Sequence, residues 1–383
     1  MVRYAIGLMT GTSADGIDAA LVEINENSDS EFPGVQLVHF LTMPYDHHLR
    51  KRVLQLCSPK APVVAMGDLH VELGLRLGDA VNQLLAESHV SRQTVCAIGS
   101  HGQTIAHYPS GESRPLGFTI QIGDAATIAS RTGIGVVSEF RAMDMACGGQ
   151  GAPLVPYFDY AVFRSLNEDR VLLNIGGVAN VTILPHGGAV ETTVGFDTGP
   201  GNMVLDGLME LISGGTIHYD HNGALAQRGC LHRGLLEQLM SHPYFKKVPP
   251  KSTGREEFGQ AYCKALLRHM KALQLRPEDM LRTATEFVAE TIAQGIRGVQ
   301  SSPFALIASG GGVHNTSLMK AITERLNLSR PWCMSDSYGI PSDAKEAMAF
   351  AYLAWQFLKG RPTNIPSVTG AQKSVLQGTW TPP

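Results

Sequence analysis

The sequence predicts an α/β protein that consists of two similar lobes around a central cleft. The chain has 383 residues, which suggests two domains of roughly 100–200 residues each, and 44% of its residues are hydrophobic, enough for a buried core in each. Runs with the spacing of strands and of helices alternate, and one order of elements occurs twice. We place the first lobe at residues 1–165 and the second at residues 166–383. For the last helix and the tail, packing back on the first lobe is an open alternative.

The first lobe is expected to begin with a β-hairpin at Tyr4–Ile24, where two apolar runs flank a polar turn. The sequence FPGVQLVHFLTMPY, at residues 32–45, adds a further strand. Apolar side chains recur with helical spacing from Ala61 to Val90, which predicts a long helix. The short apolar run in VCAIGSHGQTI, Val95–Ile105, predicts a strand that ends in small polar residues at Gly99.

The second lobe starts in the same way, with a strand, a glycine turn and a strand at Arg170–Leu184. We expect a helix to start at Leu205–Leu211, a long helix at Glu278–Val299, a short strand at Phe304–Ser309 and a last helix at Asp343–Leu358. This strand ends at Gly310, as the corresponding one ends at Gly99. The alternative is that any α/β chain alternates in this way. Ligands in such folds bind at the carboxyl ends of the strands.

Composition narrows the classes of function. A formal net charge of −3 gives no basic surface for nucleic acid, and no apolar run is long enough to predict a transmembrane helix. The N-terminus lacks the layout of a signal peptide. Six scattered cysteines without a C-x-x-C pair favour reduced thiols in a cytoplasmic protein over disulfides or a zinc site. The 41 glycines lie beside apolar runs, which is typical of loops that approach a ligand closely.

The turn inside YAIGLMTGTSADGIDAALVEI is the first candidate site. Its residues are Gly11, Thr12, Ser13, Ala14, Asp15, Gly16, Ile17 and Asp18. Backbone N–H groups in such a turn can cradle an anion, and the two hydroxyl groups add donors. Asp15 and Asp18 could hold a hydrated Mg²⁺, which prefers oxygen ligands. The alternative is an ordinary polar hairpin loop with Asx turns.

Two further glycine turns follow apolar strands, NIGGVAN at Asn174–Asn180 and SGGGVHN at Ser309–Asn315. Three such turns are stronger evidence for a phosphate-binding protein than one. None has the spacing of a Walker A motif, and none has the G-x-G-x-x-G spacing of a dinucleotide site. An enzyme of hydride transfer is therefore the weaker alternative.

The motif GFDTGPGN, Gly195–Asn202, is the sharpest single candidate. Asp197 follows an apolar approach, and Gly199, Pro200 and Gly201 break the chain before a helix. A carboxylate at a strand end could act as a general base on a hydroxyl group or on water. The alternative is an Asp that hydrogen-bonds to its own turn.

Other polar residues have open roles. Gly148–Pro156, GGQGAPLVP, is too rich in helix and strand breakers for regular structure and is either a crossover or a substrate loop. Arg141, just before it, could pair with a carboxylate or phosphate or lie on the surface. In GSHGQTIAH, His101, Gln103 and His107 suit structural or substrate hydrogen bonds better than metal binding.

Glu346 lies three residues after Asp343. The pair matches the pattern of a capping box at the start of the last helix. The other interpretation is that Glu346 lines the cleft and contacts a polar ligand.

Seven motifs appear in one order: GLMTGTSADGID, GSHGQTI, GGQGAPLVP, NIGGVANVT, GFDTGPGN, SGGGVHN and DAKEAMAFA. Together they closely resemble the anhydro-N-acetylmuramic acid kinases, and the resemblance extends from Gly7 to about Leu358. That family belongs to the hexokinase, Hsp70 and actin-like ATPases. The resemblance therefore implies two lobes of the actin-like ATPase (ribonuclease H-like) fold.

The resemblance also implies an activity. A kinase of this family opens the anhydro bridge of 1,6-anhydro-N-acetylmuramic acid with water and phosphorylates the freed O6 from ATP. The product, N-acetylmuramic acid 6-phosphate, belongs to peptidoglycan recycling and amino-sugar catabolism. The implied cofactors are ATP and Mg²⁺, and the family suggests a cytoplasmic homodimer that binds small molecules and neither nucleic acid nor membrane.

On the family pattern, Gly11–Asp18 is the ATP phosphate loop. From its chemistry, Asp15 is our candidate for holding the metal, directly or through water. Asn174, Gly176 and Gly177 contact the phosphates from the second lobe. Gly310, Gly311 and Gly312 lie near the adenosine. Asp197 matches the catalytic aspartate. Gln103, Arg141 and Glu346 are the expected substrate contacts, with Arg141 as partner of the lactyl carboxylate.

Two other function classes remain open. One is a related ATP-dependent kinase that acts on another sugar, such as N-acetylmuramic acid or N-acetylglucosamine. The other is an ATP-binding module of the actin-like class without catalytic activity. Release of ADP that depends on the anhydro sugar distinguishes the expected kinase from both.

Overall fold

The computed structural model describes residues 2–11, 14–25, 32–58, 60–111 and 115–383. The chain forms two compact units, Met1–Phe163 with Tyr338–Pro383 and Arg164–Ser337. The boundary near residue 164 lies close to the one expected from the sequence. Residues 338–383, which we assigned to the second lobe, belong to the first unit, the alternative left open for the last helix and the tail.

The first unit is built on a mixed sheet. Its strands are β1 (Val2–Thr10), β2 (Gly16–Asn25), β3 (Val35–Pro44), β4 (Val95–Tyr108), β5 (Phe118–Ile122), β6 (Val136–Ser138) and β12 (Thr379–Thr381). Its helices are α1 (His47–Leu56), α2 (Val63–Ser88), α3 (Ala125–Thr132), α4 (Ala142–Ala146), α5 (Pro156–Phe163), α13 (Lys345–Leu358) and α14 (Pro366–Thr369). The strand order is β12-β6-β4-β1-β2-β3, with β5 paired to β4. The expected hairpin, third strand and long helix are therefore confirmed.

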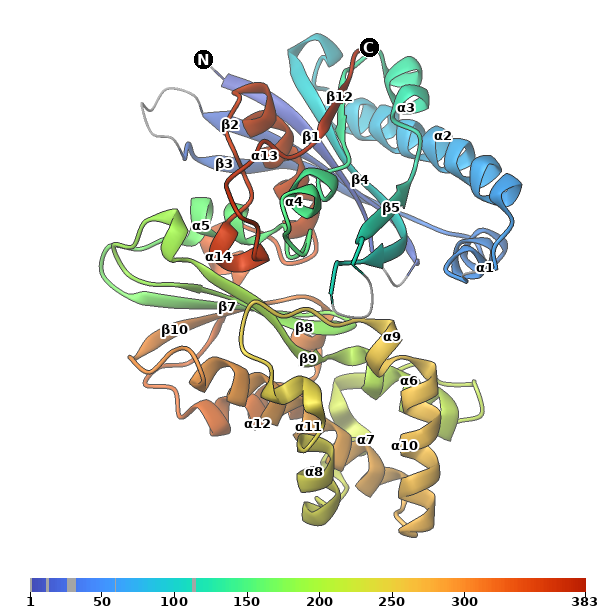
Figure 1. Ribbon diagram of the computed structural model, residues 1–383, viewed down its shortest axis with the longest axis vertical. Coiled ribbons are helices and arrows are strands. Elements are labelled where there is room, and N and C mark those ends of the chain that lie inside the picture. Colours follow the sequence, from blue (N-terminus) through green and yellow to red (C-terminus); the bar gives the residue numbers. More distant parts are fainter. Residues whose placement is uncertain (1, 12–13, 26–31, 59, 112–114) are drawn as a thin grey trace. The chain divides into compact units, whose positions relative to one another are not determined.

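Alternate residues of β1 face opposite sides of this sheet. Ile6 and Leu8 belong to the core under α2 and α3, and α13 packs on the other face (Figure 1). On that face Gly7 and Gly99 are paired in register on adjacent parallel strands. A Cβ on Gly7 would lie 1.8 Å from the carbonyl oxygen of Ala347, and one on Gly99 would lie 2.0 Å from that of Phe350. These glycines therefore let the helix backbone rest directly on the sheet.

The second unit is also built on a mixed sheet. Its strands are β7 (Asp169–Ile175), β8 (Val178–Leu184), β9 (Val194–Pro200), β10 (Phe304–Ser309) and β11 (Cys333–Met334). Its helices are α6 (Asn202–Ile212), α7 (Ala224–Gln227), α8 (Arg233–Met240), α9 (Arg255–Phe258), α10 (Gln260–Ala272), α11 (Pro277–Arg297) and α12 (Thr316–Leu326). The strand order is β11-β10-β7-β8-β9.

The two sheets follow the same path. In each, three antiparallel strands are followed by one that pairs parallel to the first, β4 on β1 and β10 on β7. A further parallel strand then extends the sheet, β6 in one unit and β11 in the other. The duplicated α/β unit confirms the predicted class, an α/β protein with two similar units.

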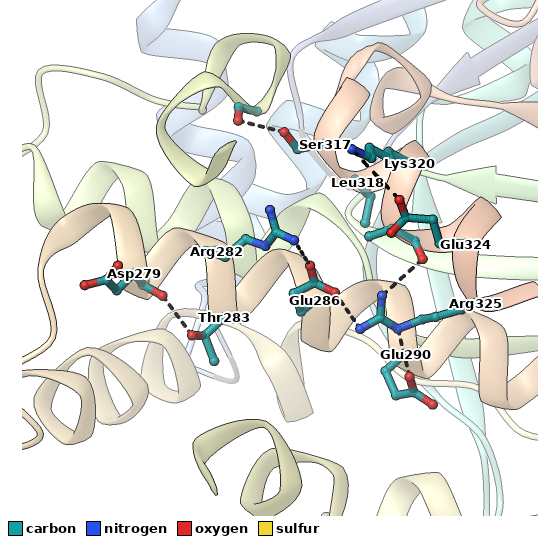
Figure 2. A network of polar contacts seen from close by, with 12 residues as sticks. Asp279, Arg282, Thr283, Glu286, Glu290, Ser317, Leu318, Lys320, Glu324 and Arg325 are labelled. Carbon is teal, nitrogen blue, oxygen red and sulfur yellow. Dashed lines mark hydrogen bonds and ion pairs between the residues drawn. The ribbon is translucent and has the colours of Figure 1, made fainter. Parts of the chain in front are cut away.

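Helices α11 and α12 of the second unit are joined by charged side chains (Figure 2). Glu286, buried on α11, forms ion pairs with Arg282 at 2.6 Å and with Arg325 of α12 at 2.5 Å. Arg325 also reaches Glu290 at 2.8 Å. Breaking one side of a buried network of this kind leaves a charge without compensation. The network therefore fixes α12, the helix that follows the third glycine turn.

Three local expectations were wrong. Strand β4 does not end at Gly99 but continues to Tyr108. Helix α13 starts at Lys345 with Ala344 as N-cap and no side-chain cap, so Asp343 and Glu346 form no capping box. Helix α6 begins at Asn202, three residues before the expected start. No helix in the described ranges is long and apolar enough to cross a membrane.

Candidate active site

The turn between β1 and β2 carries the first expected phosphate loop. Thr12 and Ser13, two residues of that prediction, lie outside the described residues. The carbonyl oxygen of Gly11 accepts hydrogen bonds from the N–H of Ala14 and from the side-chain amide of Gln103, each at 3.1 Å. Ala14 has a φ of 52°, a left-handed conformation that is costly for a residue with a Cβ. The turn is thus held from the neighbouring strand β4.

The rest of this turn is divided between core and surface. Ala14 and Ile17 are each 1% exposed in the hydrophobic core, so their side chains are not available to a ligand. Gly16 lies so close to β3 that a Cβ would be 2.8 Å from the carbonyl oxygen of Met43. Asp15 is exposed, and its carbonyl oxygen accepts from the N–H of Tyr45 at 2.8 Å.

Asp15 and Asp18 have the donor chemistry that a hard cation requires. Asp18 is half-buried on β2 and accepts a hydrogen bond from the hydroxyl group of Thr42 at 2.6 Å. Burial raises the pKa of Asp18, and the nearby charges of Asp15 and Asp343 raise it further. A divalent cation would relieve this repulsion, so the residues present fit Mg²⁺, which keeps several waters and needs one or two carboxylates.

The described residues do not form a metal site from protein ligands alone. No group of three or more His, Cys, Asp or Glu side chains that could hold a metal occurs among the residues that the structure describes. Asp15 and Asp18 would therefore supply only part of the coordination of a cation.

Arg141 joins three of the motifs in the first unit. It precedes α4, and its guanidinium donates to Nε2 of His101, at 2.8 and 3.2 Å, and to the carbonyl oxygen of Gly151, at 2.7 Å. Burial, with the charge of Arg141, holds the pKa of His101 well below its usual range. His101 is therefore a neutral acceptor that orients Arg141. The structure thus places GSHGQTI, Arg141 and the Gly148–Pro156 loop together.

Asp144 organises that loop, and sequence reasoning missed it. It is fully buried and accepts from the N–H of Gly151 at 2.8 Å, from Asn364 at 2.8 Å and from Thr369 at 2.7 Å. A Cβ on Gly149 would lie 2.2 Å from a carboxylate oxygen of Asp144. The loop is therefore wrapped around one buried carboxylate, with a glycine where a side chain would collide with it.

Glu346 lies in the first turn of α13 and is half-buried. Burial raises the pKa of its carboxyl group, Lys345 lowers it, and Asp18 raises it again. Lys345 itself forms a buried ion pair with Asp159 of α5 at 2.9 Å, which sequence reasoning also missed. Glu346 therefore lies within electrostatic range of Asp18 and of Arg141 in the same unit.

In the second unit the three glycine-containing motifs gather at the ends of β7 and β10. The carbonyl oxygens of Gly176 and Gly177 accept hydrogen bonds from the first N–H groups of α6, between 2.8 and 3.1 Å. Gly310 has a φ of 83°, and a Cβ there would lie 2.7 Å from the side-chain oxygen of Asn174. A Cβ on Gly312 would lie 2.2 Å from Ile175. Gly311 is the first residue of the 3₁₀ turn Gly311–His314, which connects β10 to α12.

Asp197 lies on β9, opposite Asn180 of β8. It is half-buried, and its carboxylate accepts a hydrogen bond from the N–H of Thr253 at 2.9 Å. Its backbone N–H donates to the carbonyl oxygen of Lys251 at 3.1 Å, and its carbonyl oxygen accepts from the hydroxyl group of Tyr244 at 2.6 Å. Asp197 is therefore fixed on both backbone and side chain, as a general base requires.

The segment Lys251–Thr253 contacts Asp197, and sequence reasoning missed it. The ammonium group of Lys251 lies 4.9 Å from the ring centre of Tyr244 and 5.8 Å from that of Phe196. Burial lowers the pKa of Lys251, and the charge of Asp197 opposes that shift. The only signal in the sequence was the polar cluster KSTG after two prolines, which also fits an ordinary loop.

Two α/β units with one strand path, glycine turns at the strand ends and a fixed carboxylate beside them define the class that the motifs predicted, the two-lobed kinases. The model of the family described as anhydro-N-acetylmuramic acid kinase matches residues 3–383. The chain belongs to the anhydro-N-acetylmuramic acid kinase family.

Curated relatives agree over nearly the whole chain, and each carries the name anhydro-N-acetylmuramic acid kinase. The relative from Saccharophagus degradans is 45% identical over 380 residues, which cover 98% of each chain. The relative from Gloeobacter violaceus is 41% identical over 376 residues, 98% of this chain and 97% of its own. The relative from Caldanaerobacter subterraneus is 40% identical over 388 residues, 98% of this chain and 96% of its own.

Proposed function

We propose that this chain converts 1,6-anhydro-N-acetylmuramic acid, water and ATP into N-acetylmuramic acid 6-phosphate and ADP. The reaction would recover an amino sugar in peptidoglycan recycling. The observation that carries the proposal is the carboxylate of Asp197, which lies in the middle of β9 and is held by the N–H of Thr253, in a chain that belongs to this family from residue 3 to residue 383.

Asp197 is the proposed general base. The acceptor O6 is an ether oxygen until the anhydro bridge breaks, so it carries no proton for a base to remove. Asp197 instead takes a proton from a water molecule, whose oxygen forms the new bond to C1. The electrons of the broken C1–O6 bond pass to O6, which attacks the γ-phosphorus, and ADP leaves with the electrons of the broken P–O bond. The N–H of Thr253 holds one carboxylate oxygen in place during this step.

Phosphoryl transfer depends mainly on positioning and on charge stabilisation. We assign phosphate binding to backbone N–H groups of Gly11–Asp18 and to Asn174, Gly176 and Gly177, and the adenosine side to Gly310–Gly312. Asp15, with Asp18 beside it, would hold Mg²⁺, whose charge would stabilise the phosphate oxygens.

Arg141 is the proposed partner of the lactyl carboxylate of the sugar. Its guanidinium is already oriented by His101 and Gly151, which favours a defined geometry for an anionic ligand. We propose Glu346 as a sugar contact. Gln103 acts through the carbonyl oxygen of Gly11 as well as through any sugar contact. The proposal includes a homodimer in the cytoplasm, which sedimentation of the purified protein and fractionation of cells would test.

Release of ADP from Mg²⁺-ATP in oxygen-18 water, with the anhydro sugar present, tests the reaction. The expected result is a 6-phosphorylated sugar with the label at the anomeric position and ADP release that depends on the sugar. Release of ADP only with N-acetylmuramic acid or N-acetylglucosamine would move the enzyme to another sugar. Nucleotide binding without any sugar-dependent release would make it a non-catalytic ATP-binding module.

A further inference from the structure

Asp206 is a carboxylate that the proposed chemistry does not use. It lies on α6, four residues after Asn202, and is half-buried. No described residue forms a hydrogen bond or ion pair with its carboxylate, and burial alone raises its pKa to about 7. Buried polar groups are almost always paired, and exceptions in a protein of this kind occur preferentially at functional sites. Asp206 therefore keeps its hydrogen-bonding capacity available for a ligand.

The position of Asp206 points to the nucleotide. Residues four apart on a helix lie on the same face, so Asp206 shares the face of Asn202, about one helical turn further on. The N–H of Asn202 donates to the carbonyl oxygen of Gly176 at 2.8 Å. Its side-chain oxygen lies 3.1 Å from the place that a Cβ of Gly312 would take. This face of α6 thus lies beside both glycine turns assigned to ATP in this unit.

The neighbouring side of α6 and the next turn of the same face are accounted for. A Cβ on the next residue, Gly207, would lie 2.8 Å from the sulfur of Cys263, so α10 covers that side. Glu210, one turn beyond Asp206, is exposed and 3.9 Å from His218. Of the two carboxylates in this helix, only Asp206 is half-buried and unpaired within the described part of the chain.

The chemistry of the ligand follows from the surroundings. Desolvation is the only cause that shifts the pKa of Asp206, so no described cation or hydrogen-bond donor acts on it. A ligand can supply the missing donors, and beside the two glycine turns the vicinal hydroxyl groups of a ribose offer two that one carboxylate can accept together. In dinucleotide-binding folds an acidic residue serves the ribose hydroxyl in this way. Ribose lies next to the phosphates, one helical turn from the groups that hold them.

We propose that Asp206 accepts hydrogen bonds from the 2′- and 3′-hydroxyl groups of the bound nucleotide and makes this kinase selective for ribonucleotides. The inference rests on the proposed function, because it takes Gly310–Gly312 as the adenosine side of the ATP site. It adds a specificity-determining residue to that site.

Binding of ADP, 2′-deoxy-ADP and 3′-deoxy-ADP, measured by calorimetry without sugar, tests this inference. We expect the wild-type protein to bind ADP about 10- to 100-fold more tightly than either deoxynucleotide, the range expected for a hydrogen bond to a charged group. Asp206→Ala should bind all three equally, and no more tightly than the wild-type protein binds either deoxynucleotide, because each deoxynucleotide still keeps one of the two hydrogen bonds. Asp206→Asn should retain part of the preference, because its amide oxygen still accepts a hydrogen bond.

The matched control is Glu210→Ala, the other carboxylate of α6, which should keep the full preference for ADP. Equal binding of the three nucleotides by the wild-type protein overturns the inference without any variant. An unchanged preference in a folded Asp206→Ala also overturns it. Because the assay contains no sugar, a preference that depends on Asp206 supports the inference even if the anhydro sugar is not phosphorylated. Phosphorylation of the sugar with equal use of ATP and 2′-deoxy-ATP sinks the inference and leaves the proposed function intact.

Discussion

The first turns of the two units occupy the same place in the same strand path, yet they are built differently. In the first unit five residues separate β1 from β2, and the side chain of Gln103 holds the carbonyl oxygen of Gly11. In the second unit Gly176 and Gly177 alone separate β7 from β8, and backbone N–H groups of α6 hold their carbonyl oxygens. A turn braced by a side chain can be loosened by one substitution, whereas a turn braced by backbone cannot.

The two units also differ in the strand that carries the acidic residue of the proposed site. In the first unit Asp18 lies on the second strand and is bonded to Thr42 of the third. In the second unit Asp197 lies on the third strand, opposite Asn180 of the second. Duplication thus preserved the strand path while the two units placed their acidic groups on different strands. We therefore expect one carboxylate to serve the metal and the other the reaction.

The largest effect should separate these two carboxylates. Asp197→Asn keeps the shape of the side chain but removes the base, so turnover should fall by about 10³-fold or more while ATP binding remains. Asp18→Asn should weaken Mg²⁺-ATP binding more than it lowers turnover at saturation. Steady-state kinetics together with nucleotide binding measure both. Near-normal turnover of Asp197→Asn would remove Asp197 from the mechanism.

The next effect concerns packing on the sheet. In Gly7→Leu the new side chain would collide with the backbone of α13, because a Cβ at position 7 would lie 1.8 Å from the carbonyl oxygen of Ala347. The substitution should lower the free energy of unfolding by about 3 kcal/mol or more. Gly177→Ala in the second unit meets only Met203, at 3.5 Å, and should change stability by less than about 1 kcal/mol. Chemical denaturation of both variants compares the two sites. Equal losses would mean that the contact of α13 with β1 is not the cause.

A pH effect should distinguish the first unit, whose strand β4 carries two shielded histidines. Burial lowers the pKa of His107 from 6.5 to about 4. Between these two pH values the imidazole is therefore protonated in the unfolded chain and neutral in the folded chain. Stability is fully present above pH 6.5 and should fall as pH drops toward 4, by on the order of 3 kcal/mol from His107. His107→Gln should remove this part of the slope. A variant with the wild-type slope would assign the loss to other groups.

The smallest effect should sharpen the comparison of the turns. Gln103→Ala removes the brace on Gly11 and should raise KM for ATP about 5- to 10-fold, the range for one hydrogen bond. Asn202→Ala keeps the backbone N–H that holds Gly176 and should change KM for ATP less. Initial rates over a range of ATP concentrations measure both variants. If Asn202→Ala raises KM for ATP more than Gln103→Ala does, then the turn of the second unit depends on the side chain of Asn202.

Local patterns in the sequence predicted local structure well. The strand Phe304–Ser309 was located correctly, and the helix expected at Glu278–Val299 is Pro277–Arg297, because periodicity alone specifies such segments. Gly99 was misread as a strand end. A glycine in a strand looks the same in sequence whether it ends the strand or admits a helix, and here the contact with Phe350 decides.

For the site residues, too, local motifs could be predicted and long-range contacts could not. Their motifs could be recognised, but the groups that hold them are distant in sequence. Asp144 binds Asn364 and Thr369, and Asp197 is held by Thr253, contacts that only the folded chain brings about. The sequence does not distinguish a buried aspartate from an exposed one. The local pattern around these residues therefore could not identify their distant partners. The roles assigned to the individual site residues remain predictions.

The order in which the chain is made gives the packing of α13 a further consequence. Arg164–Ser337 is one continuous stretch, whereas the first unit needs Tyr338–Pro383 to be complete. During synthesis the second unit can fold as soon as it leaves the ribosome. The sheet of the first unit must wait, with the strip along Gly7 and Gly99 uncovered, until α13 emerges. A chain released before that point would carry a finished second unit and an open sheet face.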